Sequence, residues 1–266
     1  MSTGLYELTQ QALLAPDPET KCTQAASLYD AWQSGQLHFD SDSPILPVDD
    51  PGRPAKPQLI DPRKLGRRSI ATEQGRIYLL HSFAHIEFTA INIALDAVYR
   101  FRDMPESYIG DWLLVASEEA KHFRLLETSL RQRGSGYGDC EAHGGLWDMV
   151  CRTRHDSLHR MALVPRVMEA RGLDVTPGMI ERFQQVDDDD AVAILRVIYD
   201  DEIGHVRIGN RWYQYLCEQR QLDPIETFQG LINDYLGGQL RGPFNWPGRV
   251  EAGFEESELR LLEQNQ

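Results

Sequence analysis

Four long segments of the chain repeat apolar residues with the 3.6-residue period of a helix that buries one face. The apolar stripes run through residues 80–98, 112–130, 147–169 and 191–216. None of these segments alternates with a two-residue period and β-branched enrichment, as a half-buried strand would. The pattern therefore predicts an all-α fold built around four helices, with essentially no sheet.

The chain before the first stripe has a different character. Residues 1–15 and 19–36 predict two short helices, whereas residues 44–57 contain five prolines. Because proline fixes φ and removes a backbone donor, the stretch from about 37 to 68 predicts an extended arm. The stretch also holds enough Ile, Leu and Val to lie against a surface, and a disordered linker is the alternative.

The chain after the fourth stripe predicts a second arm. The sequence R-G-P-F-N-W-P-G-R at 241–249 is rich in glycine and proline, and a short helix is expected after Glu255. The expected division is N-terminal helices and a Pro-rich arm at 1–75, a four-helix bundle at 76–220, and a C-terminal arm with a short helix at 221–266.

Each apolar stripe carries one glutamate on its apolar side, where a charged side chain is unexpected. Two of these glutamates begin a Glu-x-x-His motif, Glu119 with His122 and Glu202 with His205. Residues three apart lie on the same face of a helix. Several buried carboxylates would be costly and would repel one another, and bound divalent cations remove both penalties. The pattern predicts a metal site, with a buried ion-pair network as the alternative.

The spacing of the four glutamates predicts how the helices connect. Glu87 and Glu119 are 32 residues apart, and Glu169 and Glu202 are 33 apart, as expected for consecutive antiparallel helices with short loops. The interval between the two pairs is 50 residues, which leaves a surplus for one long crossover in the Gly-rich stretch 133–145. Two antiparallel pairs joined by one crossover form the ferritin-like four-helix bundle.

Six ligands of this kind can hold two metal ions. One glutamate from each Glu-x-x-His helix would bridge the metals, each histidine would bind one metal, and the other two glutamates would be terminal ligands. Carboxylate and imidazole suit iron or manganese, and the four cysteines form no C-x-x-C that would favour zinc. The predicted ligands are Glu87, Glu119, His122, Glu169, Glu202 and His205, and catalysis is expected to depend most on Glu119 and Glu202.

The third segment leaves its ligand open. Pro165 should kink the helix one turn before Glu169, and Gly172 and Pro177 should interrupt it afterwards. Either the helix bends and resumes at 177–186, or another acid takes the place of this glutamate. The candidate replacements are Glu181 and Asp156.

Several other polar residues could have either a structural or a functional role. His81 and His85 have the i, i+4 spacing of a ligand pair, but His85 could instead support Glu87 from outside the ligand set. The run of four aspartates at 187–190 is expected to cap the fourth helix rather than to attract metal. Tyr199 is either a packed aromatic residue or a residue that faces bound oxygen.

Long strings of this sequence resemble a known family. The stretches H-S-F-A-H-I-E-F-T-A-I, E-E-A-K-H-F-R-L-L, M-A-L-V-P-R-V-M-E-A-R-G-L-D-V-T-P and D-D-E-I-G-H-V-R-I-G-N-R-W resemble bacterial ferritin-like proteins catalogued as a domain of unknown function. The resemblance implies a ferritin-like core with a di-iron centre. The chain is more distantly similar to the tRNA hydroxylase branch of ferritin-like enzymes, whose pattern of Glu, Glu-x-x-His, Glu, Glu-x-x-His matches the same six ligands. Asn92 departs from the family, whose first helix has an acid there.

Composition and charge narrow the function classes. The formal net charge of −14 disfavours a nucleic-acid partner, although residues 63–68 and 124–134 offer local positive charge. No apolar run approaches the ~20 residues that span a bilayer, and no secretory signal is visible at the N-terminus. A cytoplasmic protein without membrane contact is therefore expected, with its cysteines reduced.

These features together predict a non-haem di-metal oxidoreductase. Two iron ions, with manganese as the alternative, would activate dioxygen as co-substrate for the oxidation of a small organic substrate, with electrons from a separate donor. The alternatives are a ferroxidase or iron-storage protein, a tRNA-modifying hydroxylase, and a metal-bound scaffold. The long segments outside the bundle would obstruct a closed shell, so a monomer or small homo-oligomer is expected.

Overall fold

The computed structural model describes residues 4–39, 44–66, 69–238 and 240–264. These residues form helices and no strand, with only two isolated bridges, and the all-α prediction is thereby confirmed for them. No helix among them is both long and apolar enough to cross a membrane. The chain divides into two compact units, Met1–Cys151 and Arg152–Gln266. The predicted three-part division, with boundaries at 75 and 220, stays a prediction.

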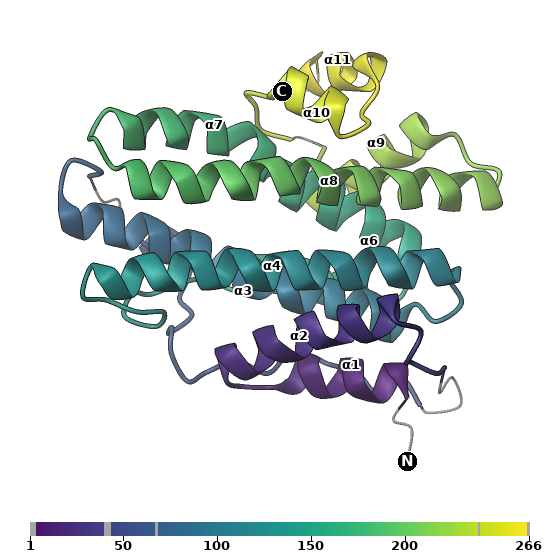
Figure 1. The fold of residues 1–266 in the computed structure, drawn as a ribbon. Coiled ribbons are helices and arrows are strands. Elements are labelled where there is room, and N and C mark those ends of the chain that lie inside the picture. Colours follow the sequence, from purple (N-terminus) through teal and green to yellow (C-terminus); the bar gives the residue numbers. More distant parts are fainter. Residues whose placement is uncertain (1–3, 40–43, 67–68, 239, 265–266) are drawn as a thin grey trace. The chain divides into compact units, whose positions relative to one another are not determined.

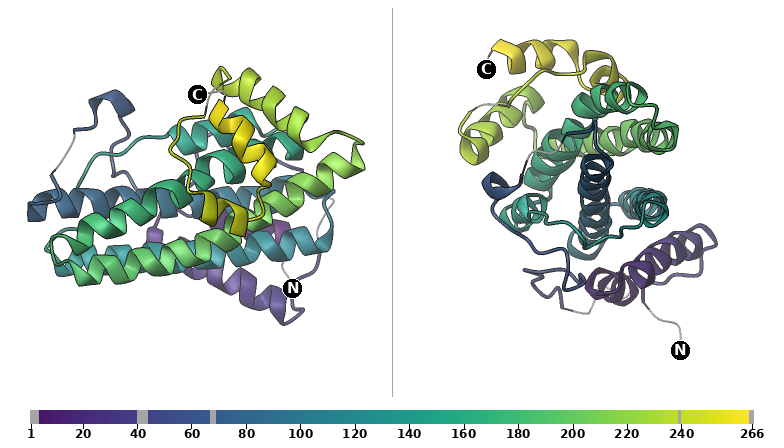
Figure 2. Two further views of the ribbon diagram at one scale, coloured as in Figure 1. Left: turned by 90° about the horizontal axis from the view of Figure 1, so that it is seen from above. Right: turned by 90° about the vertical axis from the view of Figure 1, so that its left-hand side faces the viewer.

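The first unit is built on two long antiparallel helices, α3 and α4 (Figure 1). Helix α2 packs on α4, and α1 packs on α3 (Figure 2). The elements of this unit are α1 (Leu5–Leu14), α2 (Pro18–Gln33), η1 (Pro62–Lys64), α3 (Glu73–Arg100), α4 (Glu106–Gln132) and α5 (Gly145–Arg152). Between α2 and α3 the described chain has no α-helix or strand. It consists of irregular backbone, the 3₁₀ turn η1 and short turns at residues 34–35 and 70–71, and its prolines disfavour regular structure.

A local signal explains where α3 begins. The Thr72 hydroxyl caps α3 by accepting a hydrogen bond from the Gly75 amide at 3.1 Å. Residues 87–99 of α3 are all buried, so this helix is enclosed on every face over more than three turns. Glycine is required at position 75, because a Cβ there would lie 1.8 Å from the Ser69 carbonyl oxygen. The helix that carries Glu87 is therefore fixed at its start and throughout its centre.

The second unit contains an antiparallel pair, α7 and α8 (Figure 1). Its elements are α6 (Ser157–Leu163), the π-helical segment η2 (Val164–Glu169), α7 (Ala170–Gln184), α8 (Asp189–Gln219), α9 (Pro224–Leu236), α10 (Trp246–Glu251) and α11 (Glu256–Gln264). The Asp188 side chain caps α8 by accepting from the Ala191 amide at 3.2 Å. The aspartate run therefore has the capping role that its position predicts.

The third predicted helix differs from the structure. Instead of one helix over 147–169, the chain forms α5, a break, α6 and then η2. The expected interruption at Gly172 and Pro177 is wrong, because α7 runs through both residues. The buried residues of α7 include Leu173, Thr176 and Phe183, and their packing outweighs the unfavourable propensities of glycine and proline.

The C-terminal region is more helical than its composition suggests. Helix α9 was not predicted, although Asp223 caps it, Pro224 is its first residue and Gly237 ends it with φ of 71°. Helix α10 lies inside the stretch expected to be a non-helical arm, whereas α11 matches the short helix expected after Glu255. Residues 1–3 of the first predicted helix, and Arg67 and Arg68 of the basic stretch, lie outside the described residues.

Candidate metal centre

Helices α3 and α4 bring Glu87, Glu119 and His122 together inside the first unit. All three are buried, with exposures of 2%, 0% and 0%. His122 Nδ1 lies 3.2 Å from Glu87 Oε2 and 3.3 Å from Glu119 Oε2. Each residue offers one ligand atom within 4.8 Å of the others, a spacing that a shared metal ion can bridge. One helical turn aligns Glu119 with His122, and the antiparallel α3 supplies Glu87 at the same level.

The electrostatics of this cluster are those of a cation site. Burial, followed by the negative charge of Glu119, raises the pKa of Glu87 well above its usual range, and the His122 ring opposes this rise. Two carboxylates in one dry space cannot both ionise without a positive partner. A divalent cation would therefore displace a proton and bring both carboxylates into their charged, ligating form.

The second unit repeats the Glu-x-x-His arrangement on α8. Glu202 Oε1 lies 3.6 Å from His205 Nδ1, and the two side chains are 12% and 1% exposed. Both residues lie on one face of α8, as the i, i+3 spacing requires. These two residues form a pair within their own unit, as Glu119 and His122 do in the first.

Glu169 occupies an irregular position in the second unit. It ends the π-helical segment η2, directly before α7, and is partly buried. Pro165 has no N–H to donate, which accounts for the loss of regular α-helical bonding there. Gly209 of α8 allows a close approach at this point, because a Cβ would lie 2.3 Å from Pro165 Cβ.

The two acids considered as replacements for Glu169 have other roles. Asp156 caps α6 by accepting from the Leu158 amide at 2.7 Å, and it pairs with Arg220 at 2.7 Å. Glu181 is exposed on α7. Asp156 is engaged as a cap and ion-pair partner, and Glu181 is exposed, so Glu169 remains the candidate from this segment. That all six predicted ligands surround one centre stays a prediction.

The other polar candidates have partners of their own. His81 Nε2 accepts from the Gly138 amide at 2.9 Å. His85 Nε2 donates to the His143 carbonyl oxygen at 3.0 Å, and its Nδ1 accepts from the Tyr137 hydroxyl at 2.9 Å. The expected support of Glu87 by His85 is therefore wrong, because both ring nitrogens are engaged elsewhere. The Tyr199 hydroxyl accepts from Asn245 at 2.8 Å, as for a packed aromatic residue.

A buried lysine beside α3 is a feature that the periodicity of the sequence did not reveal. Lys21 Nζ donates to Asn92 Oδ1 at 2.6 Å and to the carbonyl oxygens of Ala12 at 3.0 Å and Leu13 at 2.6 Å. Burial lowers the pKa of Lys21 to about 7. Asn92 thus ties α2 to the helix that carries Glu87.

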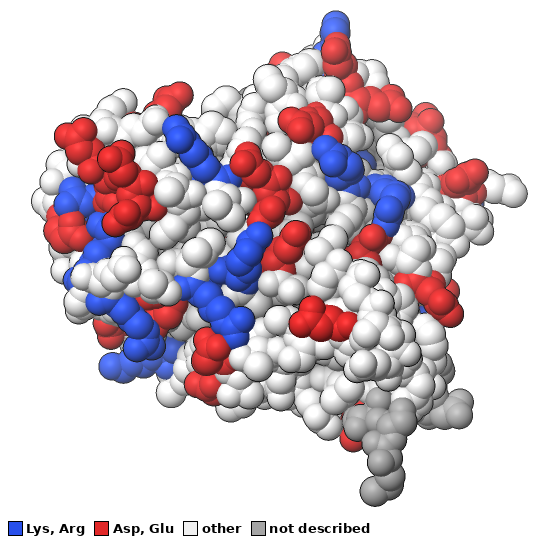
Figure 3. Space-filling model, viewed as in Figure 1, with Lys and Arg blue, Asp and Glu red and all other residues white. Residues whose placement is uncertain are grey.

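The basic stretch on α4 is largely neutralised by nearby acids. Arg124 lies 2.5 Å from Glu19, and Arg133 lies 3.1 Å from Glu73. On the face shown in Figure 3, acidic and basic side chains are interspersed. These pairings reduce the free positive charge of the stretch. That nucleic acid is not a partner stays a prediction.

The fold and this geometry define an all-helical protein that buries two carboxylates and an imidazole within reach of a common metal ion. The chain belongs to the family described as "Protein of unknown function (DUF455)", whose model matches residues 14–260. A protein of Haemophilus influenzae described as "Uncharacterized protein" is 43% identical over 267 residues, which cover 97% of this chain and 93% of that protein. No solved structure matches the chain.

Proposed function

We propose that this protein is a ferritin-like di-metal oxidoreductase that uses two iron ions and dioxygen to oxidise a small organic substrate. The observation that carries the proposal is the buried cluster of Glu87, Glu119 and His122, whose ligand atoms lie within 4.8 Å of one another. Acidic residues are almost never fully buried unless they are paired or bind a metal. Two such residues in contact with an imidazole are better explained by a cation than by packing.

The chemistry of the donors fits iron. Carboxylate oxygens and imidazole nitrogen suit Fe(II) and Mn(II), whereas soft thiolates would favour zinc. All four cysteines are free, and none belongs to the described cluster. The donor set therefore supports a hard divalent cation, with manganese as the alternative to iron.

The second half of the proposed centre comes from the sequence pattern. Glu202 and His205 repeat the motif of Glu119 and His122, and they contact each other within their own unit. In the proposed centre, Glu119 and Glu202 would each help to hold both metals, and each histidine would hold one of them. Glu87 and Glu169 would each hold one metal. The π-helical segment that ends at Glu169 supports this role, because such segments are frequent at functional sites.

Bound iron would supply the electrons and the open coordination position that dioxygen chemistry needs. The chain's own contribution is to hold the ligands, to keep water out and to exchange protons for metal. Complete burial of Glu119 and His122 excludes water from their side of the centre. The reductant is proposed to be a separate electron donor, and the assembly a monomer or small homo-oligomer.

Metal analysis of the full chain, followed by anaerobic loading with Fe(II) and exposure to dioxygen, tests this proposal. We expect two iron ions per chain and dioxygen-dependent oxidation of Fe(II). Glu119→Ala and Glu202→Ala should each lose metal. Glu118→Ala is the matched control, because it removes the neighbouring carboxylate of the same helix, which is partly exposed, and it should keep both metals.

The outcomes separate the proposed oxidoreductase from its alternatives. Accumulation of ferric mineral in a large cage, seen by size-exclusion chromatography, would replace it with iron storage. Salt-sensitive RNA binding that accompanies activity would favour the tRNA hydroxylase alternative. Metal content that is unchanged in both alanine variants, or bound iron that never reacts with dioxygen, would overturn the proposal.

A further inference from the structure

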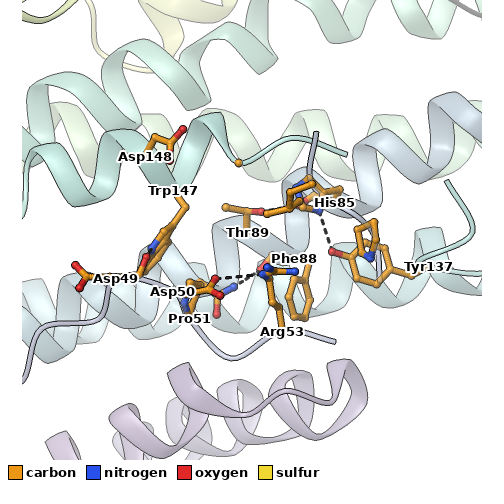
Figure 4. A pocket seen from close by; sticks show the side chains of 14 residues that line it. Asp49, Asp50, Pro51, Arg53, His85, Phe88, Thr89, Tyr137, Trp147 and Asp148 are labelled. Carbon is orange, nitrogen blue, oxygen red and sulfur yellow. Dashed lines mark hydrogen bonds and ion pairs between the residues drawn. The ribbon is translucent and has the colours of Figure 1, made fainter. Parts of the chain in front are cut away.

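A cavity of about 140 Å³ lies in the first unit, beside the α3 residues His85, Phe88 and Asn92 (Figure 4). Its other walls come from the arm before α3 and from the segment around Tyr137 and Trp147. The proposed metal centre does not account for this cavity. The question is whether the cavity belongs to that centre or forms a separate site.

Helix geometry separates the cavity from Glu87. At 3.6 residues per turn, His85, Phe88, Thr89 and Asn92 share one side of α3, and Glu87 points roughly 150° away from the middle of that side. The body of α3, about 10 Å across with its side chains, lies between them. A molecule in the cavity therefore cannot reach the metal ligands, so the cavity is an independent site that does not rest on the proposed function.

The polar groups of the inner wall already have hydrogen-bond partners within the protein. The Tyr137 hydroxyl donates to His85, Thr89 Oγ1 donates to the His85 carbonyl oxygen at 2.8 Å, and Asn92 accepts from Lys21. The surface that remains available to a ligand is mainly aromatic, because the rings of Phe88, Tyr137 and Trp147 all line the cavity. Such a wall favours a flat, apolar ring.

Arg53 supplies hydrogen-bond donors at this cavity. Its Nε donates to Asp50 Oδ1 at 3.1 Å, and its side chain is 33% exposed. Among the residues that the structure describes, no hydrogen-bond acceptor contacts its Nη1 or Nη2 group. Arg53 and His85 both line the cavity.

Of the three acidic residues in the lining, Asp50 pairs with the Nε of Arg53, and the other two lie away from its guanidinium. Figure 4 shows Arg53 beside Phe88, whereas the carboxylates of Asp49 and Asp148 lie toward the side of Trp147. Both aspartates are exposed, so water and salt screen their charges. The two Nη groups next to the aromatic wall are a planar pair of donors that matches a carboxylate.

We propose that this cavity binds a small aromatic carboxylate, with its ring against Phe88 and Trp147 and its carboxylate on the Nη groups of Arg53. The volume of the cavity, about 140 Å³, agrees with this ligand, because an apolar cavity of about 150 Å³ accommodates benzene. The ligand class is thus a single six-membered ring that carries one carboxylate.

Calorimetric titration of the full chain with benzoate tests this proposal. We expect saturable binding of one benzoate per chain, unaffected by EDTA in the buffer, because the site does not involve the metal. Arg53→Gln should weaken binding at least tenfold, and Arg53→Lys should restore it only in part, because lysine lacks the planar fork. Arg63→Gln is the matched control: it removes an exposed arginine of the same arm and should bind as the wild type does.

Titrations with two further ligands separate the contribution of the carboxylate charge from that of the aromatic ring. Benzylamine has the same ring with the opposite charge, and acetate has the carboxylate without the ring, so both should bind at least tenfold more weakly than benzoate. Leu59→Trp adds bulk to a lining residue at the surface and should abolish binding without lowering the unfolding temperature. Equal binding by wild type and Arg53→Gln, tighter binding of benzylamine, or no binding of benzoate at millimolar concentration would overturn the proposal.

Discussion

At the scale of single residues, burial distinguishes the candidate centre from ordinary surface charge. Glu87 is 2% exposed, and the charged or ionisable groups that act on it within the described part of the chain are the Glu119 carboxylate and the His122 imidazole. Other buried acids pair with arginines instead, as Asp174 does with Arg249 and Glu258 does with Arg166. A metal site and a structural ion-pair network therefore predict opposite consequences for the loss of one buried charge.

Glu87→Gln distinguishes these two explanations. If the carboxylate serves a metal, the metal-free variant should have an unfolding free energy within about 1 kcal/mol of the wild type, or higher, because the buried acid and its repulsion are gone. The same variant should lose metal affinity. Urea unfolding of metal-free protein gives the first quantity and metal analysis the second. A fall of about 3–5 kcal/mol in the metal-free form would instead indicate a structural ion pair.

At the scale of elements, the third segment shows how packing directs an irregular backbone. Pro165 sits in the π-helical segment η2, and Gly209 of α8 leaves the space that its ring occupies. The two residues are complementary, since a side chain on α8 at this point would collide with the ring. The close approach holds α8 against the segment that ends at Glu169.

Gly209→Ala should therefore destabilise the protein despite alanine's higher helix propensity. Its Cβ would lie 2.3 Å from Pro165 Cβ and 2.5 Å from Pro165 Cγ, and overpacking of this kind costs about 1–3 kcal/mol. Gly204→Ala is the control on the same helix, because its Cβ meets nothing within 4 Å. It should stabilise by up to about 1 kcal/mol. Chemical denaturation of both variants checks the pair, and equal effects would contradict the steric explanation.

At the scale of the whole molecule, the proposed ligands are divided between the two compact units. Glu87, Glu119 and His122 belong to the first, and Glu169, Glu202 and His205 to the second. If the two sets of ligands share one centre, loss of a ligand from either unit should remove all of the stability that bound metal adds to the full chain. If each unit has a separate site, loss of a ligand should remove only the stability that its own site adds.

Mn(II) should therefore raise the unfolding temperature of the metal-free chain. A substitution in either half of the proposed ligand set should abolish this rise. At a hundredfold excess over Kd, bound ligand contributes about 2.7 kcal/mol. Glu119→Gln and Glu202→Gln should each remove this stabilisation completely, whereas Glu118→Gln should keep it. Scanning fluorimetry with and without Mn(II) measures the effect. Retention of about half of the stabilisation in each variant would indicate two independent sites.

The sequence alone determined the features that depend on local periodicity. The helical period of apolar residues marked α3, α4 and α8, and the same period placed Glu87, Glu119 and Glu202 on faces where acids are unexpected. The Glu-x-x-His motifs were visible because residues three apart must share a helix face. The cap of α8 was visible because an aspartate run before an apolar period is a local signal.

Only the tertiary structure decided the features that join distant parts of the chain. The hydrogen bond from Tyr137 to His85 spans 52 residues, and that from Lys21 to Asn92 spans 71. The continuous α7 depends on buried contacts that outweigh its glycine and proline. The cavity beside Arg53 arises where the arm, α3 and the segment around Trp147 meet. Local sequence encodes periodicity and capping, whereas burial and long-range pairing exist only once separate segments have packed together.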